Sequence, residues 1–200
     1  GNLRSLVVLP FVNIGDAGDE YFADGMTEET INALTNVKRL RVVARSTAFQ
    51  FKGKPQDVRE LGKRLNVEAV LEGSVRRQQH QLRVTAQLIR VADGTIIWSK
   101  TWDRALSDVF AVQREIAQTI AGDLGPAARR PGTANLDAYN LYLLARFHRN
   151  KVSPAAIHKA IQAYRGAIEK DPGYAAAWAG LADCYQLQGY TGLVAPKVAY

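Results

Sequence analysis

The sequence predicts two parts of different fold class, a two-layer α+β domain over residues 1–125 and an all-α helical repeat segment over residues 136–200. The first part has apolar runs and alternating segments in the order β-α-β-α-β-β-β-α, which predicts a mixed five-stranded sheet with helices on one face. The second part carries apolar residues at helical spacing only. Between them, residues 126–135 contain Pro126 and Pro131 and are predicted to form the linker.

The first elements of the α+β domain are a buried strand and a helix. Residues 6–9 form a continuous apolar run that ends at Pro10, as in a strand buried on both faces. A loop rich in glycine and aspartate follows over residues 15–19. A helix is then predicted over residues 27–37, because Thr27 is a good N-cap and two glutamates follow it at the positive end of the helix.

The middle of the domain is predicted to hold one more strand and helix before a run of three strands. The strand covers residues 40–44, and the helix covers residues 55–66, since its first residue is a proline. Three strands are then predicted over residues 67–77, 82–91 and 95–104, and in the middle one apolar and polar residues alternate.

Turn and cap residues define the end of the domain. Asp93 and Gly94 suit a tight hairpin between the last two strands, because glycine adopts positive φ without steric cost. Trp98 and Trp102 share one strand face and are expected to pack in the core or under a helix. Ser107 is predicted to cap a long helix with this inward stripe: Val109, Val112, Ile116, Ile120 and Leu124.

Small and large residues alternate at fixed spacing in the second part, around an Asp-Pro pair. The positions are Ala160, Tyr164, Ala167, Asp171, Pro172, Trp178, Leu181, Ala182 and Tyr185. This register resembles the tetratricopeptide repeat (TPR), a helix pair of 34 residues in which small residues leave room for aromatic ones. It predicts helices over residues 136–150, 154–170 and 174–188. They would form one atypical repeat and a second that is cut short at Tyr200, so we expect a piece of a longer protein.

The repeat register also implies a partner surface. In repeats of this kind the first helix of each pair lines a concave groove that binds a protein or peptide. The groove residues expected here are Tyr142, Arg146, Arg149, Asp183 and Gln186. Arg149, with Arg146 nearby, would bind an acidic peptide or a C-terminal carboxylate.

Several segments of the first part, read together, resemble one family. They are VLPF at residues 8–11, YFADGMTEE at 21–29, VARS at 43–46, LEGSVR at 71–76 and TAQLI at 85–89, followed by Trp98, Asp103, Arg104 and residues 108–110. The set resembles the TolB N-terminal-like domain, which is related to the flagellar FlgO-type module. The resemblance covers residues 3–124.

This resemblance implies a regulatory role. In that family the domain is often followed directly by TPRs and accompanies the output domain of a bacterial signalling protein. We therefore expect a non-catalytic sensory or protein-interaction region, belonging to a class III adenylate or guanylate cyclase. Two alternatives stay open: the periplasmic sensor region of a winged-helix (CadC-like) transcriptional regulator, and an envelope assembly factor.

No motif for catalysis, a metal or a cofactor is found in the sequence. The three histidines are dispersed, and neither a zinc pattern nor a phosphate-binding loop occurs, so no catalytic residue, metal or cofactor is expected. Cys184 is expected to be a small buried residue. Gly73 predicts a bulge or a close backbone approach within its strand, and Glu72 is expected to lie at a strand edge or in a salt bridge.

The best local candidate for a ligand site is the loop that precedes the predicted helix at Thr27. Asp24, Gly25 and Thr27 would present free backbone N–H groups to an anion, with Arg45 and Ser46 nearby. Because the acidic residues there would repel an anion, turn and capping roles are the alternative.

The net charge of +7 is unevenly distributed. Residues 1–125 hold 17 basic and 15 acidic residues, whereas residues 126–200 hold 9 and 4. The first part is thus nearly neutral and has no basic reading element with interleaved aromatic residues, so direct binding of nucleic acid is not expected. No apolar run is long enough to span a membrane, and the sequence does not decide between cytoplasm and periplasm.

Overall fold

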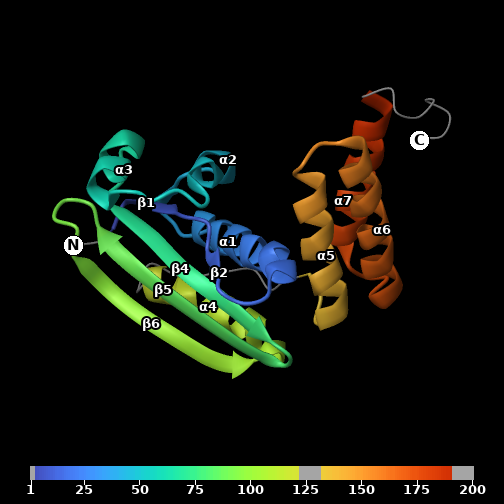
Figure 1. The fold of residues 1–200 in the computed structure, drawn as a ribbon, viewed down its shortest axis with the longest axis horizontal. Helices are drawn as coiled ribbons and strands as arrows, with labels where there is room; N and C mark the ends of the chain where they lie inside the picture. The colour runs from blue at the N-terminus through green and yellow to red at the C-terminus, as the bar shows by residue number, and fades with distance from the viewer. Residues whose placement is uncertain (1–2, 122–131, 191–200) are drawn as a thin grey trace. The chain divides into compact units, whose positions relative to one another are not determined.

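The computed structural model describes residues 3–121 and 132–190 (Figure 1). The chain divides into two compact units, residues 1–129 and 130–200, each described here by itself. Of the predicted linker over residues 126–135, residues 126–131 lie outside the described part.

The first unit is built on a mixed sheet with the strand order β3-β1-β4-β5-β6, in which β2 also pairs with β4. β1 runs parallel to β3 and β4, while β4, β5 and β6 form an antiparallel meander. The short β2 makes six strands where five were predicted. The bounds are β1 Ser5–Val8, β2 Val12–Asn13, β3 Arg41–Val42, β4 Ala69–Gln78, β5 Gln81–Arg90 and β6 Ile96–Ala105.

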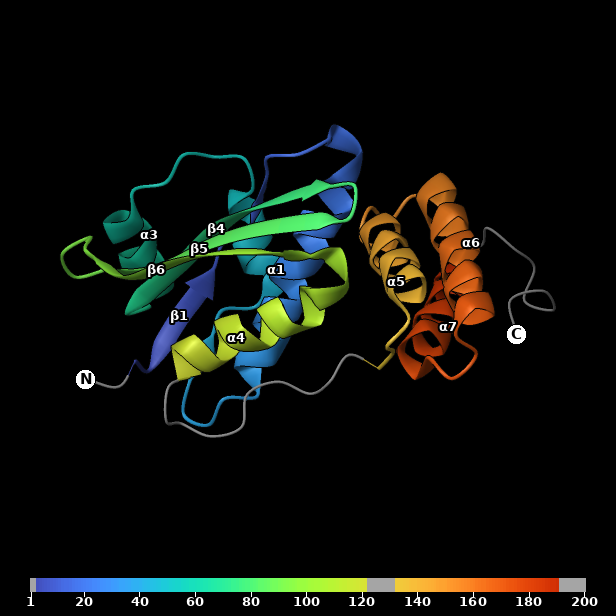
Figure 2. The same ribbon diagram turned by 90° about the horizontal axis from the view of Figure 1, so that it is seen from below.

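Helices cover both faces of this sheet (Figure 2). They are α1 Glu20–Thr35, α2 Arg45–Ala48, α3 Val58–Leu65 and α4 Val109–Ala121, with 3-10 turns η1 Ala17–Asp19, η2 Phe49–Phe51 and η3 Leu106–Asp108. On the face of α1 and α4, the buried Trp102 of β6 donates to Glu115 of α4 at 2.7 Å. On the other face, Val7 and Val70 pack with α3 and with the α2–η2 segment. The prediction of helices on one face is therefore wrong, because the apolar run of β1 buries alternate side chains on opposite faces.

The largest difference from the prediction is the start of α1. The helix begins at Glu20, so Thr27 lies in its interior and is not an N-cap. The Thr27 hydroxyl is fully buried, where it donates to the carbonyl of Ala23 and accepts the backbone N–H of Phe11, both at 2.9 Å. The Thr27 hydroxyl therefore binds the backbone of the segment at Phe11 and does not cap the start of the helix.

Two other helix starts are displaced by a few residues. α3 begins after Asp57, whose carboxylate accepts two backbone N–H bonds of the first turn, and not at Pro55. α4 begins at Val109 after η3, which contains the predicted cap Ser107.

The second unit is helical throughout its described part, with α5 Leu136–Arg149, α6 Pro154–Lys170 and α7 Ala175–Tyr190. These bounds agree with the predicted helices. Asn135 caps α5 by accepting the N–H of Ala138 at 3.0 Å, and Ser153 caps α6 with Pro154 at the first helical position.

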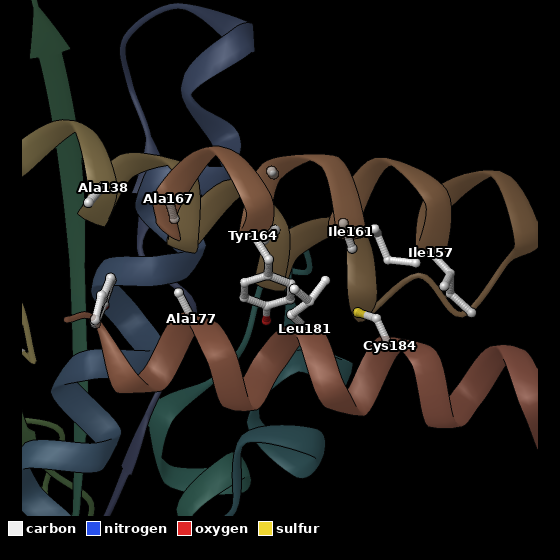
Figure 3. Packing of buried hydrophobic residues seen from close by; sticks show 12 residues of the cluster. Ala138, Ile157, Ile161, Tyr164, Ala167, Ala177, Leu181 and Cys184 are labelled. Carbon is white, nitrogen blue, oxygen red and sulfur yellow. The ribbon is translucent and has the colours of Figure 1, made fainter. Parts of the chain in front are cut away.

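Small side chains let α6 and α7 approach each other closely (Figure 3). Ala160, Ala167 and Ala177 are fully buried in the shared core. A Cβ added at Gly180 of α7 would lie 2.3 Å from the ring of Tyr164 of α6, so glycine is needed where this ring meets the helix.

Candidate functional site

Four of the five predicted groove residues of the second unit contact one another in two pairs, and the fifth is a residue of α7. Arg149 of α5 and Asp183 of α7 form an ion pair at 3.2 Å, with 40% and 56% of their side chains exposed. Arg146 donates to the hydroxyl of Tyr142 at 3.3 Å. Gln186 is exposed on α7.

This arrangement changes the role expected of two residues. Tyr142 packs with its ring centroid 5.0 Å from Tyr174 and 6.0 Å from Tyr164, so it contributes to the helix core. Arg149 already has a carboxylate partner in Asp183. A carboxylate from another molecule would therefore have to replace Asp183.

The predicted ligand-loop residues do not form a loop. Asp24, Gly25 and Thr27 are buried within α1, which leaves no helix N-terminus there for an anion. Arg45, at the start of α2, pairs with Glu28 of α1, and Ser46 is exposed.

Asp24 belongs instead to a cluster of charges between α1 and the segment after η2. Lys52 lies 2.5 Å from Asp24 and 2.6 Å from Glu20, so one ammonium serves two carboxylates. Burial raises the pKa of Asp24 above its usual value, and Lys52 partly opposes this shift. Burial alone would lower the pKa of Lys52, but its hydrogen bonds to Asp24 and Glu20 and the attraction of their charges together outweigh burial and raise the pKa. These contacts give the cluster a structural role.

A groove of about 570 Å³ lies on the sheet face opposite α1 and α4. Its polar floor comes from paired positions of β4 and β5, where Glu72 faces Gln87 and Ser74 faces Thr85. Gly73 of β4 also lines the groove, and the remaining lining residues come from two segments of chain: Leu9, Pro10 and Val12, and Phe51, Gly53, Lys54, Pro55 and Gln56.

Gly73 and Thr27 hold one wall of this groove in place. A Cβ at Gly73 would lie 2.3 Å from the carbonyl oxygen of Thr85 and 3.3 Å from the ring of Phe11, so the predicted close backbone approach is confirmed. Thr27 binds the backbone of Phe11, whose neighbours Pro10 and Val12 line the groove.

Glu72 differs from its prediction. It lies in β4, an interior strand, and is half-buried. In the part of the chain that the structure describes, its carboxylate makes no hydrogen bond or ion pair. In the sequence, the polar floor of the groove is indicated only by polar residues that alternate along two neighbouring strands. This pattern does not identify which residues face each other across the strands.

Other site chemistry is limited in the described part of the chain. Within residues 3–121 and 132–190, histidine, cysteine and acidic side chains form no group of three that would hold a metal ion. The helices in these ranges include none that is long and apolar enough to cross a membrane. Cys184 is fully buried, as predicted, and burial raises the pKa of its thiol to about 11.

Comparison with known proteins finds a family model and a relative that is similar over most of this chain. "Putative adenylate cyclase 3" of Rhizobium meliloti (strain 1021) is 40% identical over 186 residues, which cover 88% of this chain and 32% of that protein. The chain thus spans about a third of the length of that relative.

Comparison with solved structures finds matches of low similarity. A PelC dodecamer from Paraburkholderia phytofirmans is 20% identical with a TM-score of 0.45, over 63% of this chain and 91% of that one. The lipoprotein GNA1162 from Neisseria meningitidis is 18% identical with a TM-score of 0.45, over 61% and 99%.

Residues 2–119 match the family described as "HilA/YgeH-like transcriptional regulator, second domain". The description is that of a regulator-type domain. Because the match extends over more than half of the sequence, the chain belongs to the family of HilA/YgeH-like regulator second domains.

Proposed function

We propose that the chain is a non-catalytic sensory or protein-interaction region of a bacterial signalling protein, the accessory part of a class III adenylate or guanylate cyclase. The observation that carries this proposal is the 40% identity to the Rhizobium meliloti protein, which extends over 88% of the chain and so into both units. The catalytic domain would lie in the remaining length of such a protein. Membership of a regulator family supports the accessory role.

In this proposal a TolB N-terminal-like domain over residues 1–125 is followed by TPRs over residues 136–200. Helices α5 and α6 would be the first repeat, and α7 the first helix of the second. The contact between Arg149 and Asp183 supports this, because these residues are 34 positions apart, which is one repeat length.

The partner surface would be the side of α5 and α7 that carries Arg149, Asp183 and Gln186, with Tyr142 and Arg146 beside it. A protein or peptide carboxylate would replace Asp183 on Arg149. Such an exchange costs little, since an exposed ion pair contributes only about 0–1 kcal/mol.

Cyclic-nucleotide output of the full-length protein, expressed in a strain without its own cyclase, tests the proposal. Deletion of residues 1–200 is expected to leave an active enzyme whose output differs from that of the intact protein at equal abundance. The double exchange of Arg149→Asp with Asp183→Arg keeps the ion pair but reverses the surface charges, and is expected to reproduce part of that change. Equal output from the intact and deleted proteins, or no cyclic nucleotide from either, would contradict the proposal.

A second candidate is the periplasmic sensor region of a winged-helix transcriptional regulator, which the HilA/YgeH-like match favours. It predicts that the same double exchange alters transcription from a target promoter without any change in cyclic-nucleotide level.

A further inference from the structure

The groove on β4 and β5 has the size of a small-molecule site. Its volume of about 570 Å³ falls within the range of roughly 300–1,000 Å³ that is typical of such sites. Leu9, Pro10, Val12 and Phe51 supply apolar surface, and 59% of Val12 is exposed. Apolar walls over a floor with few polar groups would bind the body of an organic molecule and orient its polar end.

The floor contains polar groups that have no partner within the described residues. The side chains of Glu72, Ser74 and Gln87 make no hydrogen bond or ion pair there. Farther along the same sheet face, charged side chains have partners, since Arg83 forms an ion pair with Asp103 at 2.6 Å. Side chains without hydrogen-bond partners thus lie in the groove, whereas Arg83 and Asp103, outside it, are paired with each other.

The charge of the floor selects the ligand. Glu72 is half-buried, and a partly desolvated carboxylate is stabilised by a nearby positive charge. Lys54 is the one basic residue among the lining residues, but it is exposed and makes no ion pair with Glu72. The carboxylate of Glu72 on the floor would repel an anion, whereas an ammonium or guanidinium group would form an ion pair with it.

The floor strands leave no backbone edge for an added peptide strand. β4 pairs with β1, β2 and β5, and β5 pairs with β4 and β6. A ligand in the groove must therefore be held by side chains, which favours a compact molecule over an extended peptide that adds to a sheet.

We propose that this groove binds a small organic cation, with an ammonium or guanidinium group at Glu72 and Gln87 and an apolar body against Leu9, Pro10 and Phe51. The site belongs to the α+β unit and is independent of the partner surface proposed on the helices.

Three matched compounds test the site on the intact 200-residue chain: 4-phenylbutylamine, 4-phenylbutanol and 4-phenylbutyrate. Binding is followed by the backbone amide shifts of the floor residues in two-dimensional NMR spectra. We expect the amine to shift these amides and to bind about tenfold more tightly than the alcohol, since a charge-assisted hydrogen bond supplies that difference. The carboxylate is expected to bind most weakly.

Three variants separate the charge effect from a change of fold. Glu72→Gln is nearly isosteric and is expected to weaken amine binding about tenfold while leaving alcohol binding unchanged. Lys54→Gln removes a like charge from the lining and is expected to leave amine binding equal or slightly tighter. Asp103→Asn removes a carboxylate from the same sheet face outside the groove, and is expected to leave amine binding unchanged.

Several results would overturn the proposal. They are amine binding that does not shift the floor amides, equal binding of amine and carboxylate, and retained amine preference in Glu72→Gln. Tighter binding of a lysine-containing peptide than of the amine would assign the groove to peptides and reject the small-molecule site.

Discussion

Replacing Thr27 with valine is expected to destabilise the first unit by removing one particular hydrogen bond. The Thr27 hydroxyl accepts the buried N–H of Phe11 at 2.9 Å, and valine has the same shape without an acceptor. The Phe11 amide would be left buried without a partner, which costs about 1–3 kcal/mol. The hydroxyl also donates to the carbonyl of Ala23, so this second bond is lost too.

Thr30→Val is the matched control for this change. Thr30 lies in the same helix, is fully buried like Thr27, and donates to the carbonyl of Met26 at 2.8 Å in the same i→i−4 manner. Its hydroxyl accepts no backbone N–H in the described contacts. The difference between the two variants therefore isolates the bond to Phe11.

Urea unfolding gives the free energy of unfolding of each variant. Trp178→Phe as the common background leaves Trp98 and Trp102, both in the first unit, as the fluorescent reporters. Thr27→Val is expected to lose about 1–3 kcal/mol more than Thr30→Val, and its Phe11 amide to exchange hydrogen faster. Equal losses with an unchanged Phe11 exchange rate would refute the reasoning.

Two further predictions concern the groove and the charge cluster. Gly73→Ala places a methyl group 2.3 Å from the carbonyl oxygen of Thr85 and is expected to cost about 1–3 kcal/mol, whereas Gly18→Ala, with open space around it, is expected to be tolerated when both are unfolded in urea. Lys52→Met is expected to cost about 1–3 kcal/mol at neutral pH because it leaves Asp24 buried without its cation. The pKa of Lys52 is raised on folding, so its contribution is complete below pH 10.5 and is lost as the pH rises through the folded value. A Lys52→Met deficit that stays constant across that alkaline range would count against this assignment.

Elements with their own local signals were predicted well from the sequence. The three helices of the second unit agree because Pro154 and regular apolar spacing mark them without reference to distant residues. The β4–β6 meander agrees because its alternation and the turn at Asp93 and Gly94 are also local.

The start of α1 was misplaced because its evidence is tertiary. A threonine followed by two glutamates is typical of an N-cap, so the local pattern predicts that the helix begins at Thr27. In the structure the helix already includes Asp24, which contacts Lys52, 28 positions later. Such a contact leaves no trace in the local pattern.

The groove was missed for the same kind of reason. Glu72 and Gln87 become neighbours only through the register of β4 and β5. Whether Glu72 has a partner depends on every segment that passes near it, and a single strand pattern carries no such information.

The outer position of β6 has a consequence for solubility. In the described part of the chain β6 pairs with β5 alone, so one row of its backbone groups remains available to another molecule. Ile96 and Ile97 are exposed at its start, at 56% and 42%, which would favour fibrous association. Lys100, Asp103 and Arg104 follow along the strand, and a second copy aligned there would have to bury or oppose these charges. The strand thus carries its own protection against aggregation.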